Sequence, residues 1–229
     1  MRKALLATLV ALVAVGCSSG GPMGGVTALA AKAYDLSLKV KPDQAFNYTL
    51  VITPEQGSQT AEVDMTMKAE KVEGDKTTFR TKITNVRQDG KPVPQAMAML
   101  GKMSIIQVRN KRGETISSAV EGSPMGNQPV NETNSVYTAS LPEKAVNVGD
   151  TWAGKDPTGA PATYKFVSVE NRGGKEAAVL ELTGAGNDRM KIEGPMKMVV
   201  DLTTGMTIEA TMTATPAGQS KMKVALKQV

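Results

Sequence analysis

Hydrophobic and polar residues alternate along most of the chain from Tyr34 onward. In residues 61–69 every second position is apolar, and these positions are Val63, Met65, Met67 and Ala69. The same period of two runs through residues 208–215 and 221–227. A period of two with one apolar face is typical of half-buried antiparallel strands. We therefore expect a mainly β fold, built as an antiparallel curved sheet or half-barrel.

Glycine-containing turns separate the alternating segments. They lie at residues 73–76, 88–91, 171–174 and 203–205, and the first, third and fourth lie between patterned segments, which predicts hairpins there. Residues 94–103 depart from the period of two, because they begin with Pro94 and then place apolar residues three and four apart. This pattern predicts one short helix near 94–102.

The chain also carries an internal repeat. Three pairs of segments match in the same order: 40–46 with 146–152, 67–79 with 166–182, and 112–116 with 204–208. We expect a single β domain, residues 34–229, made of two similar halves, 34–120 and 140–229. A connection rich in Gly, Pro and Asn, residues 121–134, joins them. Chance similarity between glycine-turn hairpins is the alternative.

The N-terminus has the pattern of an export signal. Three residues, Met1-Arg2-Lys3, precede an apolar run over 4–15 that is too short for a membrane-spanning helix of about 20 residues. The sequence Ala14-Val15-Gly16-Cys17 then resembles the bacterial lipobox, in which the cysteine is lipidated. We expect a signal peptide over 1–16 and a lipidated Cys17 that begins a flexible tether over 17–33. Ser18 follows Cys17, and in this the chain resembles bacterial lipoproteins that are anchored in the outer membrane and face the periplasm.

Charge and composition exclude several classes of function. The chain has 27 basic and 22 acidic residues, and they are interleaved rather than clustered with aromatic residues, so nucleic-acid binding is disfavoured. Histidine is absent and Cys17 is the single cysteine. This excludes His-based triads, imidazole metal sites, structural zinc clusters and intrachain disulfides. Gly-x-Ser-x-Gly, Ser-x-x-Lys and phosphate-loop motifs are also absent. We expect no enzymatic activity, no cofactor and no bound metal.

Methionine is the unusual component. Fourteen methionines exceed the three Phe, four Tyr and one Trp, and several stand in Met-x-Met pairs. Their simplest interpretation is core filling, because methionine packs irregular spaces well. Thioether ligation of Cu(I) is the alternative. A deformable interior also leaves room for an acyl chain, and the apolar stripes make five methionines candidates for lining such a ligand: Met65, Met67, Met196, Met198 and Met222.

Residues 137–152, which end in Val148-Gly149-Asp150-Thr151-Trp152, resemble a widespread family of uncharacterised bacterial envelope lipoproteins. The resemblance implies a location and no catalytic residues. Strands that curve around a short helix are also similar, in architecture alone, to the lipoprotein-localisation carrier fold, a half-barrel that holds acyl chains.

Two classes of function follow from these observations. One is a membrane-anchored, non-enzymatic envelope lipoprotein that binds a lipid or another apolar ligand in its curved sheet. The other is a structural or assembly lipoprotein that acts through protein contacts at the outer membrane. Copper handling and hydrolysis are weaker alternatives. The expected partners are the membrane, reached through the lipid anchor, a lipid ligand or an envelope protein.

Overall fold

The computed structural model describes residues 32–56, 59–122, 128–129 and 139–229. The predicted signal peptide, Cys17, nearly all of the tether and most of the connection over 121–134 lie outside the described residues. Residues 32–229 form one compact unit.

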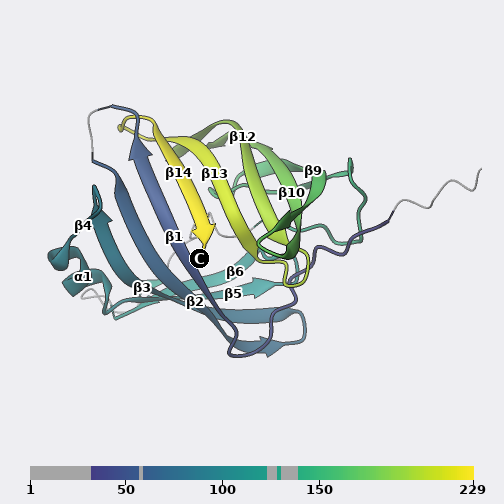
Figure 1. Cartoon of the computed structure of the whole chain (residues 1–229), viewed down its shortest axis with the longest axis horizontal. Coiled ribbons are helices and arrows are strands. Elements are labelled where there is room, and N and C mark those ends of the chain that lie inside the picture. Colours follow the sequence, from purple (N-terminus) through teal and green to yellow (C-terminus); the bar gives the residue numbers. More distant parts are fainter. Residues whose placement is uncertain (1–31, 57–58, 123–127, 130–138) are drawn as a thin grey trace, which may run out of the picture. The chain divides into compact units, whose positions relative to one another are not determined.

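The strands of the described residues form one open antiparallel sheet, which confirms the predicted fold class (Figure 1). Its order is β7-β6-β5-β3-β2-β1-β14-β13-β12-β10-β9-β8, with β4 added to β3 and β11 added to β12. The strands are β1 (Ala45–Pro54), β2 (Ala61–Glu73), β3 (Lys76–Gln88), β4 (Lys91–Pro92), β5 (Ser104–Asn110), β6 (Thr115–Glu121), β7 (Gln128–Pro129), β8 (Thr151–Lys155), β9 (Pro161–Arg172), β10 (Lys175–Gly184), β11 (Gly186–Asn187), β12 (Met190–Asp201), β13 (Thr207–Pro216) and β14 (Met222–Gln228).

Each half of the chain is a meander, and the last strand of the second half pairs with the first strand of the first half. Leu50 of β1 faces Leu226 of β14 at this junction. The turns before β1 and β8 make equivalent hydrogen bonds. The Asp43 N–H donates to Ala69 O at 2.7 Å, and the Gly149 N–H donates to Phe166 O at 2.7 Å. These are turns that the sequence comparison pairs, so the two halves share a local geometry as well as a strand order.

Alternation along the strands gives the sheet an inner face and an outer face. The inner face, which we define by Tyr48, Met67, Phe166 and Met198, carries the hydrophobic core. Phe46 is buried in this core, whereas Trp152 is half-buried against it. The outer face carries ion pairs, including those of Arg87 with Glu62 and Asp64. Most of the buried apolar side chains therefore lie on one face, as the period of two predicts.

Two irregular segments, Tyr34–Val40 and Ala139–Val146, lie over the inner face; we call them the covering segments. Leu36, Val40, Leu141 and Val146 are buried in the core. Each segment crosses a hairpin turn of the other half, because Lys39 N donates to Thr204 O and Leu141 N donates to Arg112 O, both at 2.8 Å. The covering segments also pair with each other through Tyr34 and Val146.

Glycine is required where the covering segments cross these turns. Gly113 and Gly205 both have positive φ, 78° and 72°. A Cβ at Gly205 would lie 2.5 Å from Ser37 O, and one at Gly113 would lie 2.8 Å from Ala139 O. Such approaches are shorter than a Cβ tolerates, so any other residue would displace the covering segment.

The helix α1 (Pro94–Leu100) begins at the predicted proline, next to β3 and β4 (Figure 1). The Val93 N–H donates to Val86 O at 2.9 Å, which ties the start of the helix to β3. No side chain caps its N-terminus, and none of its residues is buried. The helix therefore adds nothing to the core.

Candidate functional site

One part of the inner face is completely filled. Where the covering segments cross the second half, Leu36, Leu141, Phe166, Leu180 and Met198 have side chains no more than 1% exposed. Tyr34 packs edge-on against Phe166, with ring centroids 5.4 Å apart. This part is a closed core, so it offers no room for a ligand.

The other part of the inner face is only half-buried, and we call it the apolar band. It crosses β14, β1, β2, β3, β5 and β6, and its side chains are Met222, Leu50, Ile52, Val63, Ile83, Val86, Ile105 and Val120. The strand register places them on one face, since Leu50 faces Val63, which faces Val86, and Ile105 faces Val120. Five of them lie outside the core cluster: Ile52, Ile83, Val86, Ile105 and Val120.

The five methionines predicted to line a ligand divide between these two parts. Met65, Met67, Met196 and Met198 are at most 4% exposed and pack inside the core, whereas Met222 is half-buried in the apolar band. Their role as ligand-lining residues stays a prediction. Apart from Val63, the aliphatic residues of the band were not predicted from the sequence. The period of two on β1 and β3 was the signal that could have found Leu50, Ile52 and Ile83. β5 and β6 carry no such signal, because the inner-face positions next to Ile105 and Val120 are the polar residues Gln107 and Ser118.

Arg109 is a fully buried cation at the end of the apolar band. On β5 the inner-face positions are Ile105, Gln107 and Arg109. The Arg109 guanidinium donates to Gln107 Oε1 at 2.6 Å, contacts Met67 Sδ at 3.6 Å and lies 4.8 Å from the centroid of the Phe79 ring. A buried charge requires such close polar and cation–π contacts. Nothing in the sequence around Arg109 predicts an arginine inside the sheet.

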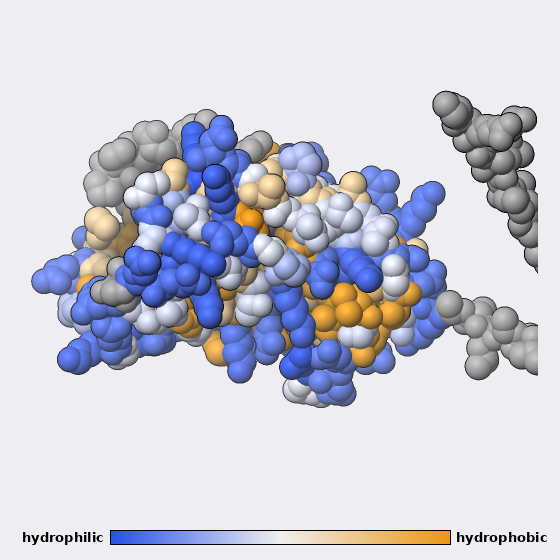
Figure 2. Space-filling view, turned by 90° about the horizontal axis from the view of Figure 1, so that it is seen from above, coloured by the Kyte–Doolittle hydropathy of each residue, from blue (hydrophilic) through white to orange (hydrophobic). Residues whose placement is uncertain are grey.

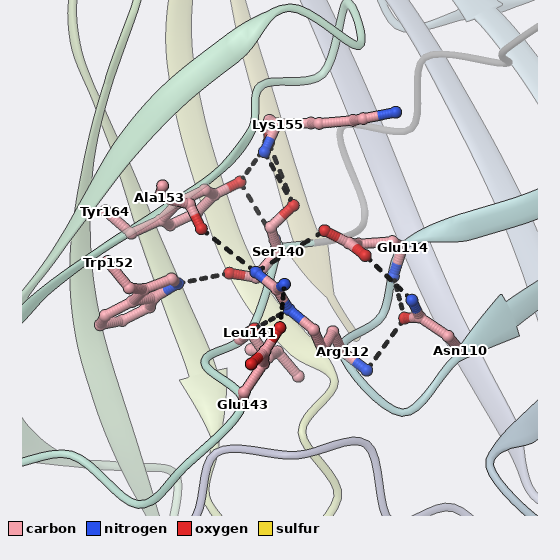
Figure 3. Close-up of polar contacts among 10 residues, drawn as sticks. All are labelled: Asn110, Arg112, Glu114, Ser140, Leu141, Glu143, Trp152, Ala153, Lys155 and Tyr164. Carbon is pink, nitrogen blue, oxygen red and sulfur yellow. Dashed lines mark hydrogen bonds and ion pairs between the residues drawn. The ribbon is translucent and has the colours of Figure 1, made fainter.

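A polar network joins the turn between β5 and β6 to the covering segment Ala139–Val146 and to β8 (Figure 3). The Arg112 guanidinium donates to Leu141 O at 2.9 Å, to Glu143 Oε1 at 3.0 Å and to Ala153 O at 3.1 Å. Trp152 Nε1 donates to Ser140 O at 2.6 Å, and its ring stacks on Tyr164 at 5.6 Å. The network therefore fixes the covering segment onto β8.

The hydroxyl groups of this network bind backbone atoms. Ser140 Oγ accepts from Lys155 N at 3.0 Å, and Tyr164 Oη donates to Lys155 O at 2.7 Å (Figure 3). Burial raises the pKa of Tyr164 to about 12. Neither hydroxyl is arranged as a nucleophile next to a base. Instead they bind the backbone N–H and C=O of Lys155, the last residue of the edge strand β8.

Other candidate sites are weak. A polar cleft of about 310 Å³ lies beside the start of α1, and its lining includes Gln88, Asp89, Lys91 and Gln95. Within the described residues there is no group of three or more His, Cys, Asp or Glu that could hold a metal ion. The search of the same residues finds no helix that could span a membrane.

Seen from above the view of Figure 1, the surface carries mostly hydrophilic side chains, and its largest hydrophobic area lies toward the end where β9 and β10 lie (Figure 2). Among the described residues, the exposed large hydrophobic side chains are Met99, Ile116, Val148, Val167 and Val229. Most of these stand singly, which is ordinary for a protein surface.

Comparison with known proteins identifies a fold and no family. No family model matches the chain, and no curated protein matches it. Lipovitellin has a similar solved structure, with a TM-score of 0.51 and 13% identity over 83% of this chain, which spans 25% of the lipovitellin chain. At this identity the likeness shows the fold alone.

Three further solved structures are more distant. A domain from Vibrio parahaemolyticus described as outer membrane lipoprotein-sorting has a TM-score of 0.38 and 12% identity, over 83% of this chain and 85% of that one. A DUF1329 family protein from Desulfovibrio piger has a TM-score of 0.36 and 10% identity, over 83% and 87%. A LolA superfamily protein from Nitrosomonas europaea has a TM-score of 0.33 and 11% identity, over 84% and 86%. Similarity this distant assigns neither a fold family nor a role, and membership of the Val-Gly-Asp-Thr-Trp family stays a prediction.

Proposed function

We propose that this protein is a non-enzymatic lipoprotein of the bacterial envelope that binds a lipid acyl chain along the apolar band. The observation that supports this proposal is the half-buried state of the band. Its aliphatic side chains continue the inner face beyond the filled core. Apolar surface that stays accessible and continuous is the usual lining of a ligand site.

The dimensions of the band suit a long apolar chain. It crosses six neighbouring strands, from Met222 on β14 to Val120 on β6. At about 4.8 Å between strands this is roughly 24 Å. Each methylene removed from water contributes about 0.8 kcal/mol, so ten of them provide about 8 kcal/mol before the cost of immobilising the chain. The similar fold of lipovitellin, whose solved structure concerns lipid–protein interactions, adds support.

Native mass spectrometry of protein purified from cells tests the ligand. We would use the full chain with Cys17→Ala, so that covalently attached lipid does not obscure bound lipid. Ile105 and Ile106 provide a matched pair, because both are half-buried on β5 but only Ile105 lies on the inner face. Ile105→Asn should reduce lipid retention by about 30-fold or more, since an unpaired amide in an apolar site costs at least about 2 kcal/mol. Ile106→Asn should retain the lipid.

A parent protein that carries no lipid and takes up no acyl probe would defeat this proposal. Protein contact at the outer membrane would then be the better explanation. Equal retention by Ile105→Asn and Ile106→Asn would show that lipid binds elsewhere. Copper handling is disfavoured by charge, because the Arg109 guanidinium lies 3.6 Å from Met67 Sδ in the Met65–Met67 pair and would oppose a second cation.

The proposed anchor is a separate part of the function. Cys17 is the last residue of the lipobox-like sequence. One acyl chain alone binds membranes only reversibly, so the stable anchor requires the several chains that lipoproteins carry. Cys17→Ala should abolish labelling by palmitate and move the protein out of the outer-membrane fraction. Label and location that persist in Cys17→Ala would contradict the anchor without affecting the ligand site.

A further inference from the structure

The helix α1 is apolar without being part of the core. Four apolar residues follow one another at helical spacing in and just after it: Ala96, Met99, Leu100 and Met103. Met99 is 57% exposed and the other three are half-buried. A helix of seven residues is too short to be stable by itself. It gains little from packing here, because none of its residues is buried and no side chain caps it.

The sequence around α1 carries basic residues and no acidic ones. Residues 90–113 contain no Asp or Glu, and Lys91 and Lys102 flank the helix as exposed cations. The nearest acidic residue before this stretch, Asp89, accepts a hydrogen bond from Thr60 N. Elsewhere acids and bases alternate, as in residues 68–76. An apolar stripe between basic residues is the composition of helices that lie in the surface of anionic membranes.

We propose that α1, together with Lys91 and Lys102, is a docking surface for an anionic lipid bilayer. Met99 enters the boundary between headgroups and acyl chains, and the two lysines contact lipid phosphates. The polar cleft beside Lys91 and Gln95 gives a headgroup room to lie against the protein, with the lipid phosphate at Lys91 and away from Asp89, which also lines the cleft. Docking also covers the stripe that the fold leaves exposed. The inference goes beyond acyl-chain binding, and its test involves no bound ligand, so either proposal can fail without the other.

A fluorophore placed on α1 tests the docking surface. We would prepare the full chain with Cys17→Ala and Met99→Cys, label the single thiol with NBD, and add vesicles of phosphatidylglycerol with phosphatidylethanolamine or of phosphatidylcholine. The apolar residues 4–15 can attach the chain to either vesicle, so the signal is the local immersion of the fluorophore. We expect a blue shift and protection from iodide on the anionic vesicles only. Immersion on neither vesicle, or equal immersion on both, would overturn the proposal.

Two controls make the result specific. The same label at Ile116→Cys, a residue 51% exposed on β6, should stay accessible to iodide. Lys91→Gln with Lys102→Gln should reduce the ratio of immersed to accessible fluorophore by about 30-fold, because each lysine contributes about 1 kcal/mol to binding at an anionic surface. Lys165→Gln with Lys197→Gln removes the same charge from exposed positions on β9 and β12 and should leave the ratio unchanged. An equal loss in both pairs would contradict a site at α1.

Discussion

Gly205→Ala tests the way the covering segments hold the inner face. Gly205 has φ +72°, and a Cβ there would lie 2.5 Å from Ser37 O and 2.9 Å from Leu38 Cα. Both atoms are backbone, so the covering segment Tyr34–Val40 would have to move. Alanine in the left-handed region costs about 1–2 kcal/mol. Partial exposure of Leu36 adds about 2 kcal/mol. We expect a total loss of about 3–4 kcal/mol in the free energy of unfolding.

Gly74→Ala is the matched control for this substitution. Gly74 lies in the turn between β2 and β3 with φ +56°, and nothing lies within 4 Å of its Cβ position. Gly74→Ala and Gly205→Ala share the strain of alanine at positive φ and the same change in the unfolded chain. Gly74→Ala should therefore lower the free energy of unfolding by only about 1–2 kcal/mol. Urea unfolding followed by Trp152 fluorescence measures both, and a difference of about 2 kcal/mol moves the midpoint by about 1 M. Equal losses for Gly205→Ala and Gly74→Ala would refute the crossing geometry.

Three further predictions concern single side chains. Trp152→Ala should lower the free energy of unfolding by about 2–3 kcal/mol, measured with urea, because the ring stacks on Tyr164 and its Nε1 donates to Ser140 O. The loss is smaller than for a fully buried tryptophan, since Trp152 is half-buried. An unchanged free energy of unfolding would contradict the network. The Arg87 guanidinium lowers the pKa of the Asp64 carboxyl below its value of 3.8 in the unfolded chain. The ion pair therefore stabilises the fold above pH 3.8, and this stabilisation is lost as the pH falls below that value. Asp64→Asn should make the free energy of unfolding depend less on pH in this acid range. Burial raises the pKa of Tyr164 from 10.0 to about 12. The free energy of unfolding should therefore decline as the pH rises between these two values. Tyrosinate absorbance from Tyr164 in the folded protein at pH 11 would disprove the raised pKa.

The sequence predicted the fold through local signals. Alternation in residues 61–69 placed Met65 and Met67 on the inner face, and Pro94 marked the first residue of α1. Turn residues predicted the hairpins at Gly74, Gly173 and Gly205. The turn at 88–91 also forms a hairpin, which joins β3 to β4. It escaped prediction because β4 has only two residues, too few to display a period.

The parts that escaped prediction depend on contacts distant in the sequence. Nothing in residues 34–40 indicates that they cross a turn near Thr204, because that position follows from the curvature of the whole sheet. Arg109 is buried for the same reason, since its contacts with Phe79 and Met67 come from two other strands. The apolar band was missed because a single strand cannot show whether its inner face is covered. Phe46, Tyr48, Leu50 and Ile52 follow one period of two on β1, yet the first two are buried and the last two are half-buried.

Photo-crosslinking of a fatty acid is the most direct test of the proposed lipid site. A diazirine-bearing fatty acid would be bound to the full chain with Cys17→Ala, irradiated and mapped by peptide mass spectrometry, with unlabelled fatty acid as competitor. We predict competed crosslinks at inner-face residues of the apolar band, including Leu50, Val63 and Ile105, and none at Ile106 on the outer face of the same strand. Crosslinks spread equally over Ile105 and Ile106, or confined to residues outside the band, would contradict the account.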